Sequence, residues 1–580
     1  MFVHAPQTLR ALVRADELWL LVLAALVGIV AGLSVTAMGS ITQYMHRLLY
    51  ALDARERLSG QVSLPALRTL AVLVTGGLVA GAFGWWATRR WPRRAVDPIE
   101  ANALHGGRMS LNDSLIVVLQ TMLSNGFGAS VGLEAGYTQI GSALASRLGR
   151  SFRVRRNDLR LLVGCGAAGA IGAAFNAPLT GAFYAFELVI GTYSLVTLAP
   201  VMISSLTAVT VVRLLSHEEL GFDIRVPSSI PAQNYLPILA LAMACALGGI
   251  LLMRAVTVTE ELFRKSRVPV WIRPAIGGIV VAGLAWISPQ VLSSGHAALQ
   301  IGLDAPYTVM QIAMLIIIKA LASAISLGSG FRGGLFFASL FLGAMVGKLF
   351  AAGLMFVSPT IAIPAVVCAV VGMSSLAVAV VGGPLTMAFL ALETTGSLPL
   401  TVAVVAASVL SAITVRRTFG YSFATWRFHL RGESIRSAVD IGWMRNLTVG
   451  RMMRREVRTV RSDTPLSSFR RDFPLGATTQ VVVVDDAGRY KGLALVSEAH
   501  ASTVEAHPRV GSILHDTDVV LVPQMTIKEA VAQFEAAESD ALAVVDSREG
   551  RKVIGLLTEQ YALRRYSEEL DRQRRELSGE

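Results

Sequence analysis

The sequence predicts an all-α polytopic membrane domain, followed by a smaller soluble α/β tail. Hydrophobic residues make up 53% of the 580 residues and charged ones only 16%, whereas soluble domains average about 25% charged. Residues 161–212 carry one charge, Glu187, and residues 349–392 carry none. Because a spanning helix needs about 20 apolar residues, each stretch holds more than one pass. From residue 447 onward, charges alternate with short Val-rich runs, which indicates a soluble fold.

The remaining apolar runs are read in chain order as further membrane segments. Arg10 and Arg14 precede the first run, as in a signal peptide, but the run is too long for one and more spans follow, so it is read as a membrane helix. Several runs are short or interrupted by Gly and Pro, and such broken helices must be buried in protein or line a cavity. The candidate segments are 18–45, 69–88, 114–144, 235–253, 274–287, 309–327, 333–346 and 400–415.

Basic residues exceed acidic ones by 52 to 40, a net charge of +12. They cluster beside apolar runs, as at Arg89–Arg90 and Arg416–Arg417, which is typical of loops facing the cytoplasm. Nucleic-acid binding would need a soluble basic face, and we do not expect it. Cys165, Cys245 and Cys368 each lie in an apolar run, which argues against a disulfide framework or a cysteine metal site.

Both parts of the chain repeat internally. Residues 165–188 match residues 371–394 at an offset of 206, which pairs Pro178 with Pro384 and Glu187 with Glu393. A Gly-rich run precedes each copy, at 126–141 and 328–343. This organisation is typical of transporters and channels built from two related halves, with the substrate site near the midplane. In the tail, 481–484 matches 542–545 at an offset of 61, and each copy reads strand–helix–strand–turn–strand.

The first Gly-rich run, GFGASVGLEAGYTQIG, places Glu134 alone at membrane depth. Glycines and a helix start let main-chain N–H groups converge on an anion, and Glu134 can itself be that anion until it is protonated or swings aside. The alternative is a carboxylate paired with a distant Lys or Arg. The second run can complete the same anion cage through Gly333–Phe336, or it can serve close helix packing.

These residues together resemble the CLC family of chloride channels and chloride/proton antiporters, over almost the whole chain. Gly132-Leu133-Glu134-Ala135-Gly136 is similar to the family motif G-K/R-E-G-P, and Gly334–Ala338 is similar to G-x-F-x-P. The resemblance implies two inverted repeats of tilted and broken helices, a homodimer with one pore per subunit, and Glu134 as the gating glutamate. It also implies anion binding at Gly132, Leu133, Glu134, Gly334, Leu335, Phe336 and Tyr421.

The same resemblance divides the chain. Residues 1–430 are expected to form the anion-transport domain and residues 431–446 a connector. The tail resembles a pair of CBS domains at 447–503 and 508–566, followed by a charged end at 567–580. CBS pairs often bind adenine nucleotides through Ser or Thr and an Asp three residues later. Ser497 and Thr558 stand at those positions but lack the Asp, and packing between tails is the alternative.

Several positions depart from the family pattern. The central serine falls on Ala95, and Asp97-Pro98-Ile99-Glu100 reads as a helix start, with Asp as the N-cap. An Asp there occupies N–H groups that otherwise face the anion. Leu188 falls on the position of the inner proton-transferring glutamate, and the neighbouring Glu187 is read as a structural carboxylate at a helix end. Arg332 either draws anions toward the pore or pairs with Glu134 or Asp97.

The resulting expectation is a passage for chloride or a similar small monovalent anion, in a cell membrane, with the tail cytoplasmic. Leu188 favours channel-like conduction, and a proton-coupled exchanger of the same family is the alternative. An enzyme or a receptor is less favoured, because the membrane part offers no nucleophile–base or metal constellation. No cofactor is expected; an adenine nucleotide at the tail is the one candidate, and the missing Asp residues argue against it.

Overall fold

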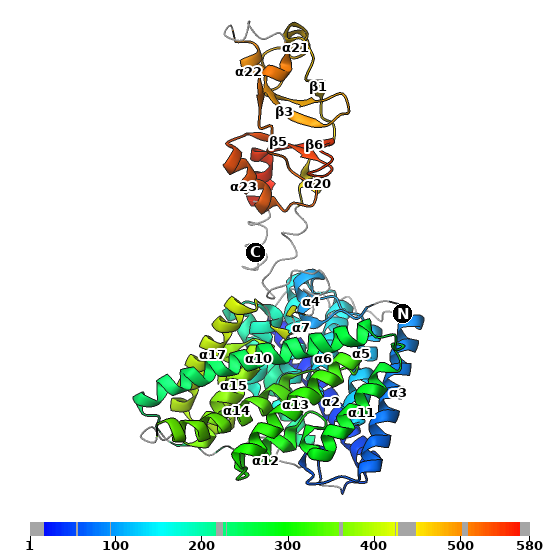
Figure 1. Ribbon diagram of the computed structural model, residues 1–580, viewed down its shortest axis with the longest axis vertical. Coiled ribbons are helices and arrows are strands. Elements are labelled where there is room, and N and C mark those ends of the chain that lie inside the picture. The colour runs from blue at the N-terminus through cyan, green and yellow to red at the C-terminus, as the bar shows by residue number, and fades with distance from the viewer. Residues whose placement is uncertain are drawn as a thin grey trace. The chain divides into compact units, whose positions relative to one another are not determined.

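The computed structural model describes residues 17–53, 56–92, 94–215, 224, 226–227, 229–358, 363–420, 422–423, 425–426, 448–501, 509–565 and 567–568. They fall into two compact units, a helical one and the C-terminal tail, and each is described by itself (Figure 1). Tyr421, the connector and most of the predicted charged end lie outside the described residues.

The helical unit is built from two successive series of helices. The first comprises α2 (Glu17–Tyr50), α3 (Ala66–Arg90), α4 (Pro98–Leu104), α5 (Leu111–Gly126), α6 (Glu134–Phe152), α7 (Arg156–Phe175), α8 (Pro178–Tyr184) with its π-helical extension η2 (Ala185–Ile190), and α9 (Leu195–Leu215). The second comprises α10 (Tyr235–Lys265), α11 (Arg273–Ile287), α12 (His296–Asp304), α13 (Val309–Ser329), α14 (Phe336–Val357), α15 (Ala365–Val381), α16 (Pro384–Thr395) and α17 (Leu398–Thr418). In the described part, eight helices are long and apolar enough to cross a membrane, which confirms a multi-pass protein.

Most predicted segments fall on single helices, but the segment 114–144 is wrong as one span. Helix α5 ends at Gly126, the chain is non-helical through residues 127–133, and α6 begins at Glu134. The break has a local cause at Gly128, whose φ of +89° is unfavourable for residues with a side chain. A Cβ there would also lie 2.4 Å from the Tyr50 hydroxyl. Residues 127–133 of the Gly-rich run therefore form a loop between two helices, and residues 134–141 belong to α6.

The two halves repeat one packing contact. A Cβ built on Gly141 of α6 would lie 2.4 Å from the carbonyl oxygen of Gly166 on α7, and a Cβ on Gly343 of α14 would lie 2.3 Å from that of Gly372 on α15. Glycine lets these helix backbones touch, as is common between membrane helices. The predicted relation between the halves is confirmed in three dimensions.

The tail is an α/β unit whose first sheet has the order β1-β2-β3-β4, with β1 parallel to β2 and the other pairs antiparallel. These strands are β1 (Thr459–Arg461), β2 (Gln480–Val484), β3 (Tyr490–Leu495) and β4 (Leu514–His515), and β5 (Ala541–Val545) pairs antiparallel with β6 (Val553–Thr558). The helices are α20 (Val449–Met452), α21 (Leu466–Asp472), α22 (Val496–Ala499) and α23 (Ile527–Ala537).

The repeat in the tail is confirmed for the strands β2 and β5 but is incomplete. Among the described residues, the second copy has no first strand, and Leu521 makes only an isolated parallel bridge to Val544. The copies also exchange their leading segments. Val449 of α20 packs in the core of the second copy, while Val510 packs in the core of the first. The two copies therefore stabilise each other.

Candidate functional site

The two Gly-rich loops, each preceding a long helix, are joined by hydrogen bonds. The Gly132 N–H donates to the Gly334 carbonyl at 2.9 Å, and the Gly334 N–H donates to the Gly132 carbonyl at 3.0 Å. These loops lead directly into α6 and α14, so the starts of both helices meet at one place. The two glycine N–H groups are occupied by this bridge, which leaves the first N–H groups of the helices to face a ligand.

Glu134 is the first residue of α6, and its carboxylate lies against both loops. A Cβ on Gly132 would lie 2.0 Å from Oε2 of Glu134, and a Cβ on Gly334 would lie 2.9 Å from it, so glycine makes room for the carboxylate at both positions. Glu134 is only 5% exposed. The main-chain N–H of Phe337, in the first turn of α14, hydrogen-bonds to the carboxylate, while Oε2 has no partner among the described residues.

One buried cation acts on Glu134. Lys319 of α13 is fully buried, and its Nζ donates to the carbonyls of Val291 at 3.0 Å and Ser293 at 3.1 Å. It interacts with Glu134 through space, and no ion pair joins the two in the part of the chain that the structure describes. Sequence reasoning missed Lys319, although a single Lys inside the apolar run 309–327 is a visible signal.

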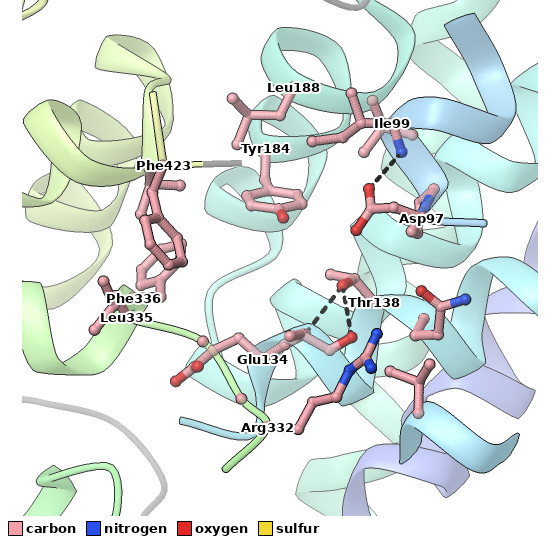
Figure 2. Close-up of a pocket in the computed structure, with 18 of the residues that line it drawn as sticks. Asp97, Ile99, Glu134, Thr138, Tyr184, Leu188, Arg332, Leu335, Phe336 and Phe423 are labelled. Atoms are coloured by element: carbon pink, nitrogen blue, oxygen red, sulfur yellow. Dashed lines mark hydrogen bonds between the residues drawn. The ribbon is translucent and has the colours of Figure 1, made fainter. Parts of the chain in front are cut away.

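A cavity of about 180 Å³ lies beside Glu134. Figure 2 shows Asp97, Ile99 and Leu188 at the top of this cavity and Glu134 at the bottom, with the Glu134 carboxylate directed away from Asp97. The predicted site residues that line it are Ala95, Asp97, Glu134, Leu188, Arg332, Gly334, Leu335 and Phe336. The lining does not include Gly132, Leu133 or Glu187. Tyr421 lies outside the described residues, and the described lining residue closest to it in sequence is Phe423.

Sequence reasoning also missed some polar lining residues, namely Thr138, Gln139 and Tyr184. The side-chain amide of Gln139 donates to the Val96 carbonyl at 2.9 Å, and this bond holds the non-helical segment before α4 against α6. The segment after α17 reaches the same end of the cavity as Leu188, because a Cβ on Gly382 would contact Leu188 and Ser422 at 3.4 and 3.5 Å.

Asp97 caps α4 as the sequence predicts. Its carboxylate accepts a hydrogen bond from the Ile99 N–H at 2.9 Å, with Pro98 at the first helical position. Glu100 in the same turn is buried and lies 3.9 Å from Arg94 and 3.7 Å from His105. The cavity is therefore lined here by the capping carboxylate of Asp97 and by Ala95, the position at which the family pattern has a serine.

Glu187 in the first half caps helix α16 of the second half, and Glu393 in the second half caps helix α8 of the first. Glu187 accepts from the main-chain N–H groups of Leu385 (2.9 Å) and Thr386 (2.8 Å) and from the Thr386 hydroxyl (2.6 Å), at the start of α16. Glu393 accepts at the start of α8 from the matching groups of Leu179 (2.7 Å) and Thr180 (2.8 and 2.6 Å). This geometry agrees with the interpretation of Glu187 as a structural carboxylate, whereas Leu188 beside it faces the cavity.

In the tail, Ser497 lies in the short helix α22 and Thr558 ends β6, where it is exposed. The residue three positions after Ser497, His500, hydrogen-bonds through Nε2 to the Phe473 carbonyl at 3.0 Å. The His500 ring is therefore bonded within the first copy of the tail, at the position where the family pattern has a ribose-binding Asp. Nucleotide binding at these two residues stays a prediction.

The described residues contain no cluster of three or more potential metal ligands. The three cysteines are buried and lie in separate helices, which agrees with their prediction as small hydrophobic residues.

Comparisons with known proteins identify the family. The profile of the voltage gated chloride channel family matches residues 76–416, more than half of the chain, and the CBS-domain profile matches residues 510–568. The voltage-gated ClC-type chloride channel ClcB of Escherichia coli O17:K52:H18 is 30% identical over 400 residues, which cover 67% of this chain and 95% of that protein.

Solved structures show the same fold. The slow cyanobacterial Cl⁻/H⁺ antiporter superposes with a TM-score of 0.63 at 22% identity, covering 71% of this chain and 97% of that one. A eukaryotic CLC transporter superposes with a TM-score of 0.60 at 18% identity, covering 94% and 98%. The chain therefore belongs to the voltage gated chloride channel family, the CLC family, with a C-terminal CBS region.

Proposed function

We propose that this protein lets chloride, or a similar small monovalent anion, cross the membrane, and that Glu134 gates the passage. The carboxylate of Glu134 competes with the anion for the N–H groups at the starts of α6 and α14. The observation that carries this proposal is the buried Oε2 atom of Glu134, seated against Gly132 and Gly334 beside the cavity. Protonation removes the charge that an anion must displace, and a neutral side chain leaves the place more readily.

We favour channel-like conduction over obligatory proton exchange. Leu188, which lines the end of the cavity opposite Glu134, has no proton to give or accept. The alternative is proton-coupled exchange, the activity named for the slow cyanobacterial antiporter. We further propose a homodimer in the cell membrane, a cytoplasmic tail, and roles for Leu335 and Phe336 as main-chain anion ligands.

Anion flux from proteoliposomes tests both parts of the proposal. Chloride efflux should rise as the pH falls, and Glu134→Gln should give a flux that no longer responds to pH. Glu261→Gln is the matched control, because Glu261 is an exposed glutamate on α10 that pairs with Lys265 at 2.8 Å. A response to pH that persists in Glu134→Gln would refute the gate. Stoichiometric proton movement against its gradient, followed with a pH electrode, would refute channel-like conduction.

A further inference from the structure

A tyrosine hydroxyl lies between the two carboxylates of the cavity. Tyr184, the last residue of α8, is close enough to interact electrostatically with both Asp97 and Glu134. Figure 2 shows its ring level with Asp97 and above Glu134, with the hydroxyl at the lower edge of the ring, and all three residues line the cavity. The three residues come from three different elements, namely the N-cap of α4, the first turn of α6 and the end of α8.

Thr138 lies beside the Tyr184 hydroxyl. The Thr138 hydroxyl lies 3.0 Å from the main-chain carbonyl of Glu134 and 3.3 Å from that of Ala135. The Tyr184 oxygen lies within hydrogen-bonding reach of the same hydroxyl and accepts from it. A phenol that accepts one hydrogen bond keeps its own proton to donate and a second lone pair with which to accept. Thr138 therefore acts as a positioning residue for Tyr184.

Other charged groups lie near Asp97 and Glu134, but none of them adds a third carboxyl group to the described lining of the cavity. On the Asp97 side, Glu100 of α4 interacts with Arg94 and His105. Arg332 lines the cavity beside Glu134 and below Thr138 (Figure 2). On the Glu134 side, the buried Lys319 of α13 supplies a positive charge. Leu188 and Val189 of η2 face the cavity with aliphatic side chains. Among the described lining residues, Asp97 and Glu134 are thus the two carboxyl groups.

We propose that Asp97 and Tyr184 carry protons across the cavity to Glu134, so that acid on the Asp97 side opens the gate without coupling anion flow to proton flow. The proposal rests on the gating role of Glu134. The Asp97 carboxylic acid gives its proton, through water, to the Tyr184 oxygen, and the phenolic proton passes on to the Glu134 carboxylate when that side chain turns into the cavity. Asp97 ends as a carboxylate, Glu134 as an acid, and Tyr184 is unchanged. The cavity of about 180 Å³ has room for several water molecules of about 30 Å³ each.

The test is the acid-activated part of chloride flux, measured from proteoliposomes between pH 4.5 and 7.5. Asp97→Asn keeps a helix cap, since Asn caps as well as Asp, and Tyr184→Phe keeps the ring while it removes the hydroxyl. Each variant should lower the acid-activated flux about 10-fold or more. Tyr137→Phe is the matched control. Tyr137 is buried on α6 and interacts with Glu134, but its hydroxyl points toward Gly39 of α2 and it does not line the cavity.

Double variants separate the route from the gate. In the Glu134→Gln background, Asp97→Asn and Tyr184→Phe should have no further effect on the pH response, because all three act in one sequence. If Glu134→Gln abolishes the acid response while Asp97→Asn or Tyr184→Phe keeps it intact, the proton route is refuted and the gate stands. If Glu134→Gln itself leaves the acid response unchanged, the gate fails, and the route fails with it.

Discussion

The reciprocal capping of α8 and α16 predicts a matched loss of stability when either glutamate is changed. Replacement of Glu393 by Gln leaves one acceptor oxygen where the carboxylate has two. Those two oxygens take three hydrogen bonds, from the Leu179 N–H at 2.7 Å and from the Thr180 N–H and hydroxyl at 2.8 and 2.6 Å. The amide NH₂ of Gln must then face at least one main-chain N–H, so two donors meet.

The size of the effect follows from these contacts. A hydrogen bond to a charged group contributes roughly 1.5–3 kcal/mol, and a buried N–H left without an acceptor costs about 1–3 kcal/mol. Because Glu393 is only partly buried, water can relieve some of this, and we expect a loss of about 2–4 kcal/mol in the free energy of unfolding. Glu187→Gln changes three matching bonds, at 2.9, 2.8 and 2.6 Å, and a further hydrogen bond from Tyr193, so it should lose a similar or slightly larger amount.

The assay is reversible unfolding of the purified protein in mixed detergent micelles, followed by helix content. Glu261→Gln serves as the reference, because this exposed glutamate pairs only with the neighbouring turn of its own helix and should change stability by less than about 0.5 kcal/mol. The reasoning is refuted if Glu393→Gln is as stable as this reference. It is also refuted if Glu187→Gln and Glu393→Gln differ by several kcal/mol, because the two caps would then not be equivalent.

Two further predictions concern helix packing and the tail. Gly343→Ala should destabilise the helical unit by about 1–3 kcal/mol or more, because its Cβ would lie 2.3 Å from a backbone oxygen. Gly353→Ala in the same helix, with nothing within 4 Å, should raise stability by up to about 1 kcal/mol, and the same unfolding assay compares them. In the tail, the Arg489 N–H, with help from that of Ala487, holds the pKa of the Asp485 carboxyl below its usual range. The stabilisation of this turn is therefore present above the unfolded pKa near 4 and is lost as the pH falls through the lower folded value. Hydrogen exchange on the full chain should show Asp485→Asn exchanging faster at the turn than the wild type at neutral pH, with the difference vanishing in acid.

Features set by neighbouring residues were predictable. The Asp97 cap follows from Asp, Pro and Glu at adjacent positions, and an N-cap bond is local by nature. The offset of 206 predicts that Glu187 and Glu393 are equivalent, because equal sequence in two halves gives equal structure. Their mutual capping was beyond this reasoning, since each bond joins residues about 200 positions apart.

Tertiary features escaped the sequence for the same reason. The hydrogen bonds between Gly132 and Gly334 depend on how two distant loops approach, and no local pattern encodes that approach. Tyr184 reads as one more aromatic residue in an apolar helix until its hydroxyl is found beside Thr138. The single segment 114–144 was wrong because mean hydropathy does not register a glycine at positive φ.

The internal symmetry separates residues that stabilise the fold from residues that line the passage. Where the halves agree, as at Glu187 and Glu393, the side chains bind one half to the other. Several cavity residues differ between the halves: the first residue is Glu134 in α6 and Phe336 in α14, and Tyr184 corresponds to Leu390 at the offset of 206. A passage must present different groups to its two ends, so only the unequal positions can set its direction and its response to acid. Replacing Glu187 or Glu393 by Gln should therefore lower stability and leave the pH response of chloride flux unchanged. Glu134→Gln should abolish the pH response and leave stability largely unchanged.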